Sequence, residues 1–511
     1  MGNGQRNFRR VAVVVGKKRK VVFRQRHFRM KQGMVVEVGD TKANGRGFRP
    51  DRVRMLKIKR TNAPATKCHD KEGEPTKAAF HIKGYEVCVI FMRSKDVFVF
   101  LWYHKKNGQR QVMISERMFE LGNKRSVIRE IFEYAKTRAA EVGAENVFDF
   151  SIGNPNVPAP QEVKEVALRL LSQDPVSLHG YTSAQGDFDV RRKIAESLNR
   201  RYGTHFSAEN FYMTAGAAAA LCIVFRALSE EGDEFITFAP YFTEYKVFVE
   251  AAGSRLTVIP AEEKDFQIDF ETLEKQLTPH TKGVLINSPN NPCGVVYREE
   301  TIQKLAELLR KKSQEFGKPI FLITDEPYRE IVYDGIRPPF VTKYYENTLV
   351  CYSFSKALSL PGERIGYVLV PQEVTDSKRV YAAVCGAGRA LGYVCAPSMF
   401  QKIAAECCDC TADLSVYRKN RDLLYQSLTA MGFQCVRPDG AFYLFVKSPE
   451  PDAYRFYERG KAFDLLFVPG DDFGCPGYVR VAYCVQTEMI ERALPRFRML
   501  WESYEKEKQG K

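Results

Sequence analysis

Between about residues 205 and 370, short runs of apolar residues alternate with stretches of helical periodicity. In the helical stretch at 301–312 the apolar side chains fall on one face, and Gly317 is a suitable helix end. The runs between helices are apolar throughout, so both faces of each strand are expected to be buried. This alternation predicts an α/β fold whose mostly parallel sheet carries helices on both faces. The runs are "EFITFAP", "GVLINSP", "IFLITDE", "LVCYSFS" and "RIGYVLV".

The pattern changes on either side of this region. A helix is predicted from Met113 to about Ala144, and after residue 405 the strands become shorter, as in "AFYLFV" and "YVRVAY". A final helix is predicted from Thr487, so a smaller α+β domain should follow the sheet domain. The predicted divisions are an N-terminal extension at 1–112, an N-terminal segment of the catalytic unit at 113–160, a large domain at 161–405 and a small domain at 406–506.

The net charge of +15 is concentrated in residues 1–112. They contain 28 Lys and Arg against 8 Asp and Glu, whereas residues 113–511 contain 49 against 54. Three interpretations of 1–112 compete: a basic nucleic-acid-binding arm, an organellar transit peptide, or a stretch upstream of the natural start. The segment lacks the serine-rich, amphipathic character of a transit peptide, and we favour an upstream extension with an authentic start at or near Met113. The mildly acidic body gives no reason to expect a nucleic-acid partner.

The 13 cysteines are dispersed over 511 residues, which is not the pattern of a disulfide scaffold, and no secretory signal precedes them. Membrane spans need about 18 or more consecutive apolar residues, and the sequence contains no such run. We therefore expect a cytoplasmic protein with no membrane partner.

In open α/β sheets, ligands bind beyond the carboxyl ends of the strands. Asp325 follows "IFLIT", Tyr328 comes three residues later, and "SFSKALSLPGERIGY" follows "LVCY". Taken singly, each residue has an ordinary structural explanation: Asp325 as a helix N-cap, Tyr328 as a core aromatic, a lysine or arginine as a surface charge. Taken together, the strand ends supply a lysine, an aspartate, a tyrosine, an asparagine and an arginine. Such a combination indicates one common binding site.

This set resembles the fold type I, class I/II aminotransferases that depend on pyridoxal 5′-phosphate (PLP), close to their aspartate-aminotransferase-like branch. The resemblance extends from about Met113 to Trp501, and its most specific element is S-x-S-K followed eight residues later by the arginine of R-x-G-Y. The motifs "NNPCG", "TDEPY" and "VRVAY" accompany it. The resemblance implies an enzyme that moves an amino group between an α-amino acid and a 2-oxo acid. The residues of the specific element are Ser353, Ser355, Lys356 and Arg364.

The resemblance also implies the cofactor residues. Lys356 would form the internal imine with PLP and then act as the proton-transfer base, as a lysine amine can. Asp325 would lie beside the pyridine nitrogen, and Tyr328 and Asn291 would hydrogen-bond the ring O3′. Phe242 would stack on the ring, although such a residue is also an ordinary core phenylalanine. The implied phosphate ligands are Arg364, Ser353, Ser355, the helix start at Ala217 and Ala218, and Tyr181 from the second subunit of a homodimer with shared active sites.

On the substrate side, the resemblance implies that Arg480 pairs with the α-carboxylate, with Asn291 beside it and Gly153 as a backbone donor. Part of the aspartate-specific branch has a lysine for the distal carboxylate where this chain has Ala218. Arg389 is a basic residue that either substitutes for that lysine or forms a structural ion pair. We therefore expect no strong preference for aspartate.

Two features lie outside this set. "CCDC" at 407–410 suggests a metal or redox site, but it lacks a second cysteine pair at zinc spacing and is predicted to be helical. We expect reduced thiols there and no metal. His179 precedes "GYTSAQG" and either approaches the cofactor or has a structural role, which we favour.

Other functions use nearly the same residues. A C–S β-lyase or a decarboxylase on this fold differs in how the substrate bonds lie against the ring, which sequence does not show. A regulator with an aminotransferase-like sensor domain would account for the basic extension, although residues 1–112 lack the amphipathic helices of a winged helix. An inactive scaffold is not favoured, because no matched cofactor residue is missing.

Overall fold

The computed structural model describes residues 114–123 and 127–509, together with short strands before residue 106. The chain divides into two compact units, 1–123 and 124–511, which are considered separately. The interpretations proposed for 1–112 fall almost entirely outside the described residues. In the first unit the longest described strands, β5 and β6, pair antiparallel. Its elements are β1 (Ala12–Val13), β2 (Phe28–Arg29), β3 (Val35–Val36), β4 (Ala65–Lys67), β5 (Thr76–Ile82), β6 (Tyr85–Phe91), β7 (Val97–Phe100), β8 (His104–Lys105) and helix α1 (Glu116–Asn123).

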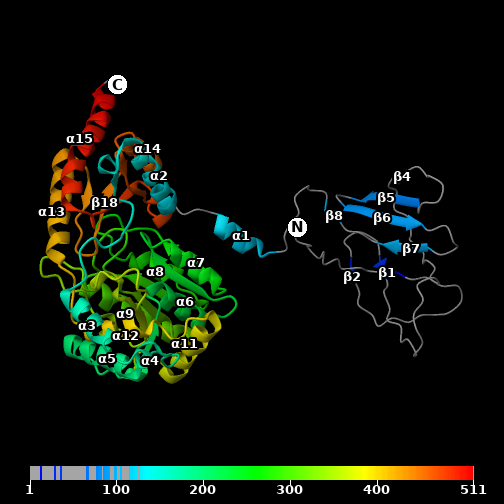
Figure 1. The fold of residues 1–511 in the computed structure, drawn as a ribbon, viewed down its shortest axis with the longest axis horizontal. Helices are drawn as coiled ribbons and strands as arrows, with labels where there is room; N and C mark the ends of the chain where they lie inside the picture. The colour runs from blue at the N-terminus through cyan, green and yellow to red at the C-terminus, as the bar shows by residue number, and fades with distance from the viewer. Residues whose placement is uncertain are drawn as a thin grey trace. The chain divides into compact units, whose positions relative to one another are not determined.

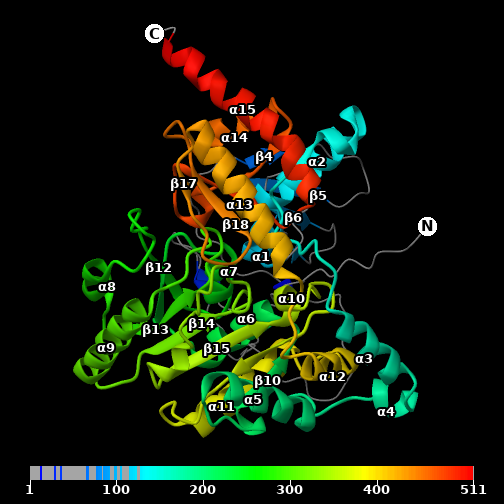
Figure 2. The ribbon, with the colours of Figure 1, turned by 90° about the vertical axis from the view of Figure 1, so that its left-hand side faces the viewer.

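The second unit is built around a seven-stranded sheet of order β10-β16-β15-β14-β13-β11-β12, which with its helices we call the large lobe (Figures 1 and 2). Within this sheet β16 alone runs opposite to the other six strands, so the predicted mostly parallel sheet is confirmed. The strands are β10 (Phe211–Thr214), β11 (Glu234–Phe238), β12 (Arg255–Ile259), β13 (Thr281–Asn287), β14 (Phe321–Asp325), β15 (Thr348–Ser353) and β16 (Gly366–Leu369).

Helices cover both faces of this sheet, as the apolar strands require. Along β15, Val350 packs into a cluster with α5 and α12, while its neighbour Leu349 packs on the other face against α6 and α11. Alternate residues of one strand thus enter two cores, which explains why the strand is apolar throughout. The helices of the large lobe are α3 (Gln161–Leu171), α4 (Pro175–His179), α5 (Phe188–Tyr202), α6 (Ala217–Leu228), α7 (Glu244–Ala251), α8 (Phe270–Gln276), α9 (Glu299–Phe316), α10 (Phe354–Ala357), α11 (Ser377–Leu391) and α12 (Ser398–Glu406).

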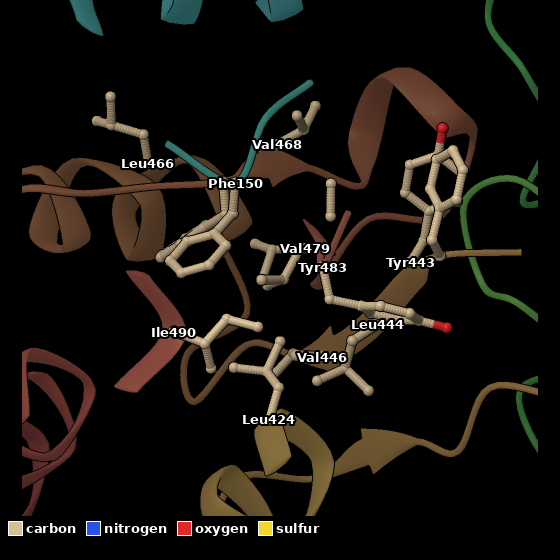
Figure 3. Packing of buried hydrophobic residues seen from close by; sticks show 14 of the residues in the cluster. Phe150, Leu424, Tyr443, Leu444, Val446, Leu466, Val468, Val479, Tyr483 and Ile490 are labelled. Atoms are coloured by element: carbon tan, nitrogen blue, oxygen red, sulfur yellow. The ribbon is translucent and has the colours of Figure 1, made fainter. Parts of the chain in front are cut away.

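The small lobe is an antiparallel sheet of order β17-β18-β21-β20 with helices packed on it, joined by the parallel pair β9 and β19. Its core includes Phe150, Leu444 and Ile490, and Tyr443 lies at one side of this cluster (Figure 3). The elements are α2 (Val127–Val142), β9 (Phe148–Asp149), α13 (Leu414–Met431), β17 (Cys435–Val436), β18 (Tyr443–Lys447), α14 (Ala453–Lys461), β19 (Leu465–Leu466), β20 (Val468–Pro469), β21 (Tyr478–Ala482) and α15 (Thr487–Gln509).

Several predicted elements can be compared directly with these bounds. The helix predicted at 301–312 is the core of α9, and Gly317 ends it with φ of 66°, a left-handed conformation that glycine adopts without strain. The final helix begins at Thr487 as predicted. The helical prediction for "CCDC" was wrong, because α12 ends at Glu406 and Cys407 follows it as the C-cap. Among the described helices, none is long and apolar enough to cross a membrane.

Candidate active site

Neighbouring strands of the large lobe end together and bring the predicted residues to one edge of the sheet. Asn287 at the end of β13 pairs in register with Asp325 at the end of β14, and its amide nitrogen donates to the Asp325 carbonyl oxygen at 2.8 Å. The oxygen of the same amide accepts from the backbone N–H of Asn291 at 2.7 Å. On the other side of β14, β15 ends at Ser353, and Lys356 follows in α10. The order of parallel strands therefore places Asn291, Asp325 and Lys356 at one edge.

Lys356 lies at the junction of the two lobes. Its Nζ donates to the carbonyl oxygen of Gly153 at 2.7 Å. The pKa of the Lys356 amine is lowered to about 8, mainly by burial, with smaller contributions from the positive charges of Arg364 and Arg480 and an opposing one from Cys484. An amine with a pKa of about 8 is partly neutral near physiological pH, which is the state a nucleophilic amine needs.

Asp325 is a buried carboxylate with one committed oxygen. Oδ2 accepts a hydrogen bond of 2.6 Å from the phenol of Tyr245, whereas Oδ1 is buried and has no hydrogen-bond partner among the described residues. The pKa of Asp325 is raised to about 7, mainly by burial and slightly by the charge of Glu326, against the opposing effect of the Tyr245 hydrogen bond. A buried carboxylate oxygen without a donor is costly, and a cationic N–H in front of it would remove that cost.

A second cluster joins the lobes around Arg480 of β21. Its guanidinium donates to Asn291 Oδ1 at 3.0 Å and to the Ser151 carbonyl oxygen at 2.6 Å, while its buried Nε has no partner among the described residues. Its Cζ lies 4.6 Å from the centroid of the Tyr443 ring. The Tyr443 hydroxyl lies 2.8 Å from the hydroxyl of Tyr328. Arg480 is thus held rigidly beside two residues that were predicted to contact the cofactor.

A third group surrounds the N-terminus of α6. Arg364, whose φ is 54°, donates to the carbonyl oxygen of Ala215 at 3.1 Å and approaches Oγ of Ser355 at 3.4 Å. Gly216 has a φ of 87°, which favours glycine, and a Cβ there would lie 2.7 Å from this guanidinium and displace it. Ser353 donates to Ser355 at 2.7 Å. The first turn of α6, with Ala217 half-buried and Ala218 exposed, therefore starts beside a guanidinium and two hydroxyls, a setting that suits a phosphate.

The remaining predicted residues are less closely integrated. Phe242 is half-buried and meets the Tyr245 ring edge-on, with centroids 5.6 Å apart, and Tyr245 in turn contacts Asp325. The Tyr181 side chain is 98% exposed in the single chain. His179 at the end of α4 and Arg389 in α11 are also exposed.

Sequence reasoning missed Tyr245, Tyr443, Asn287 and Ser151. Tyr245 lies three residues after Phe242, in the first turn of α7, and no sequence pattern distinguished it from an ordinary core tyrosine. Tyr443 was read only as part of the strand "AFYLFV". Ser151 contributes its carbonyl oxygen, which no sequence pattern identifies.

The comparisons with known proteins agree with this geometry. The family model "Aminotransferase class I and II" matches residues 145–497. The chain belongs to this family. It is 33% identical to the aspartate/prephenate aminotransferase of Thermus thermophilus over 68% of this chain and 88% of that protein. A solved aminotransferase from Eubacterium rectale is 62% identical, with a TM-score of 0.76, and covers 77% of this chain and 100% of its own.

A second solved structure, the Thermus thermophilus aspartate aminotransferase with maleate, is 29% identical, has a TM-score of 0.67 and covers 76% of this chain and all of its own. The fold is therefore that of the fold type I transferases, and this aminotransferase is a PLP-dependent transaminase acting on amino and 2-oxo acids.

The described residues fit this cofactor. The unpartnered Oδ1 of Asp325 suits a protonated ring nitrogen, and the buried Nε of Arg480 is available to a carboxylate. The helix start beside Arg364 suits the phosphate. The ring nitrogen and the phosphate of PLP and the carboxylate of an amino acid thus each have a group here that suits them.

Proposed function

We propose that Lys356 is the lysine that carries PLP in this transaminase. The observation that carries the proposal is that two unusual groups lie at the same sheet edge. They are the Lys356 amine, with a pKa of about 8, and the buried Asp325 Oδ1, which has no hydrogen-bond donor among the described residues. When bound, PLP supplies an aldehyde that condenses with amines and a protonated ring that withdraws electrons from the substrate α carbon. Asp325 would hold the ring nitrogen protonated, because a buried carboxylate is stabilised by an adjacent cation.

The other cofactor contacts follow from the same arrangement. Tyr328 and Asn291 would donate to the ring O3′, and Phe242 would cover one ring face. Asn291 is suited to this because its carbonyl oxygen already accepts from Arg480, which leaves the amide nitrogen as the donor. The phosphate would be held by Arg364, Ser353, Ser355 and the N–H groups at Ala217 and Ala218.

Arg480 would orient the substrate through its α-carboxylate, with Gly153 and Asn291 beside it. The guanidinium is 2% exposed and already fixed by two hydrogen bonds, so it would bind without losing much side-chain freedom. Lys356 Nζ is next to Gly153 and would hold or release the proton at the substrate α carbon. A pKa near 8 allows the Lys356 amine both to accept and to donate this proton near neutral pH, which a reversible amino-group transfer requires.

We also propose a homodimer with shared active sites, in which Tyr181 reaches the phosphate of the neighbouring subunit. In its support, the tyrosine is 98% exposed and lies in sequence between the exposed apolar residues Val176 and Phe188. Exposed apolar surface of this kind is typical of subunit contacts. A cytoplasmic location is proposed because all eleven cysteines among the described residues are free, as in a reducing compartment.

Borohydride treatment of the PLP-loaded protein, followed by peptide mass mapping, tests the central assignment. A pyridoxyl group on the peptide containing Lys356 is expected, and its appearance on another lysine would overturn the assignment. The Lys356→Arg variant is the matched control, since it keeps the positive charge. A parallel screen of amino donors and oxo acids, with pyruvate, ammonia and CO₂ measured, separates transamination from β-elimination and decarboxylation.

A further inference from the structure

Tyr443 of β18 is a buried tyrosine that contacts three residues of the proposed site. Its hydroxyl is 2.8 Å from that of Tyr328, and its ring lies under the Arg480 guanidinium. A Cβ built on Gly153 would lie 2.0 Å from the Tyr443 hydroxyl oxygen, so that position is closed to any larger residue. Tyr443 therefore contacts Tyr328, which is proposed to bind O3′, and Arg480, which is proposed to bind the substrate carboxylate. It also contacts Gly153, whose carbonyl oxygen accepts a hydrogen bond from Lys356.

The direction of the hydrogen bond between the two tyrosines follows from proton counting. A tyrosine hydroxyl has one proton to donate. If Tyr328 donates that proton to the cofactor O3′, Tyr443 must be the donor in the 2.8 Å bond. The same logic applies to Asn291, whose carbonyl oxygen accepts from Arg480 at 3.0 Å. Both proposed donors to O3′ are thus oriented by a neighbour on the small lobe.

We propose that Tyr443 is a positioning residue, whose hydroxyl aligns and polarises Tyr328 and whose ring supports Arg480. The inference rests on the proposed role of Tyr328. A hydroxyl that accepts a hydrogen bond becomes a stronger donor, because hydrogen bonds in a chain polarise one another. Tyr443 therefore stabilises the anionic form of O3′ through Tyr328, and it stabilises the orientation of Arg480 through a cation–π contact.

The charged and titratable groups that face this pair are Arg480 from β21, Asp325 from β14, Tyr245 from α7 and Cys484, which follows β21. Lys356 is linked to the pair through Gly153. The Tyr443→Phe substitution leaves all of these side chains in the protein and removes only one hydroxyl group. A shift in the proton affinity of the bound chromophore can then be assigned to the hydroxyl itself.

The test is a visible-absorbance pH titration of the PLP-loaded enzyme. Tyr443→Phe should raise the apparent pKa of the chromophore by about half a unit, since one hydrogen bond of ordinary strength is lost. Tyr328→Phe should raise it more, and the double variant should match Tyr328→Phe alone, because Tyr443 acts through Tyr328. Tyr333→Phe is the matched control: its buried hydroxyl donates to the Ala441 carbonyl oxygen at 2.5 Å, and the pKa should not move.

Tyr443→Leu removes the ring as well as the hydroxyl. It should reproduce the pKa shift and also raise KM for the amino acid about fivefold, whereas Tyr443→Phe should leave KM within about twofold. The Leu variant also supplies the titration if the Phe variant is unstable. An unchanged pKa in both Tyr443 variants, beside a shift in Tyr328→Phe, would overturn this inference alone. Additive shifts in the double variant would overturn the route through Tyr328, and no shift in Tyr328→Phe would overturn the proposed role of Tyr328 itself.

Discussion

The phenol of Tyr245 donates a hydrogen bond of 2.6 Å to Oδ2 of Asp325, and this bond fixes the direction of the other carboxylate oxygen. Tyr245 is 1% exposed and lies on α7, so its position is set by the core between that helix and the sheet. The carboxylate is thus held by one oxygen, while the other is the one proposed to meet the cofactor ring. Removing the Tyr245 hydroxyl should disturb the proposed contact between Asp325 and the cofactor ring, while the aromatic side chain still fills the core.

Tyr245→Phe should lower kcat by about tenfold or more, since a hydrogen bond to a buried charged group is lost. It should also weaken PLP binding, because the Tyr245 bond favours the ionised form of Asp325. The value of kcat is measured at saturating substrate, and the PLP affinity is measured by titrating the cofactor-free protein with PLP. Wild-type kcat together with wild-type PLP affinity would contradict this prediction.

Asp325→Asn should stabilise the cofactor-free protein at pH 8. The folded pKa of about 7 lies above the ordinary value of 3.8, so between these pH values the folded state keeps a proton that the unfolded state has lost. The free energy of unfolding of the wild type therefore falls as pH rises from about 4 to about 7. The Tm advantage of the asparagine variant should be largest at pH 8 and should vanish near pH 4, as thermal unfolding at several pH values would show.

Arg480→Ala should reduce kcat/KM for α-amino acids by roughly two orders of magnitude or more, because it removes one partner of a buried ionic contact. Simple amines, which lack the carboxylate, should be poor substrates of the wild type and should be little affected by the change. The exposed arginine at position 337 offers a matched control, and Arg337→Ala should keep wild-type kinetics.

Ala218 predicts no strong preference for aspartate. The test compares kcat/KM for aspartate, glutamate, alanine and phenylalanine. An aspartate preference above about a hundredfold, on the order of 3 kcal/mol, would show that another cation fills the pocket. Ala218→Lys should then be compared with the wild type, and a rise in the aspartate-to-alanine ratio is expected. The exposed Arg389 is the first alternative cation to replace if the preference is strong.

Tyr181 predicts shared active sites. Tyr181→Ala and Lys356→Ala should each be weakly active alone, but mixed dimers should regain about a quarter of wild-type activity, because half of the dimers have one complete site. Mixing Lys356→Ala with a chain carrying both substitutions is the control and should restore nothing. Full activity of a monomer at assay concentration would contradict the shared site.

Much of the fold was predictable because burial on both faces leaves a clear signal. Strands such as β15 are apolar at successive positions, and α9 shows a single apolar face that ends at a glycine. The end of α12 at Glu406 was not predicted. Cys407 and Cys408 are as compatible with a helix as with a turn, and no glycine or proline marks the boundary.

The residues proposed for the site were identifiable where their chemistry is unusual at a strand end, as for Asp325 and Lys356. The supporting residues were not, because their roles depend on contacts between distant segments. Tyr443 and Tyr328 are 115 positions apart, and Ser151 and Arg480 are 329 positions apart. No local pattern records such a contact, and a backbone carbonyl oxygen has no sequence signature at all.

The bond from Lys356 to the Gly153 carbonyl oxygen has a kinetic consequence. The amine belongs to the large lobe, whereas Gly153 lies in the segment that leads from β9 of the small lobe. A molecule that condenses with this amine must first take it from the carbonyl, so loading the enzyme breaks a tether between the lobes. The rate at which the amine becomes available to such a molecule should therefore depend on how often this hydrogen bond opens.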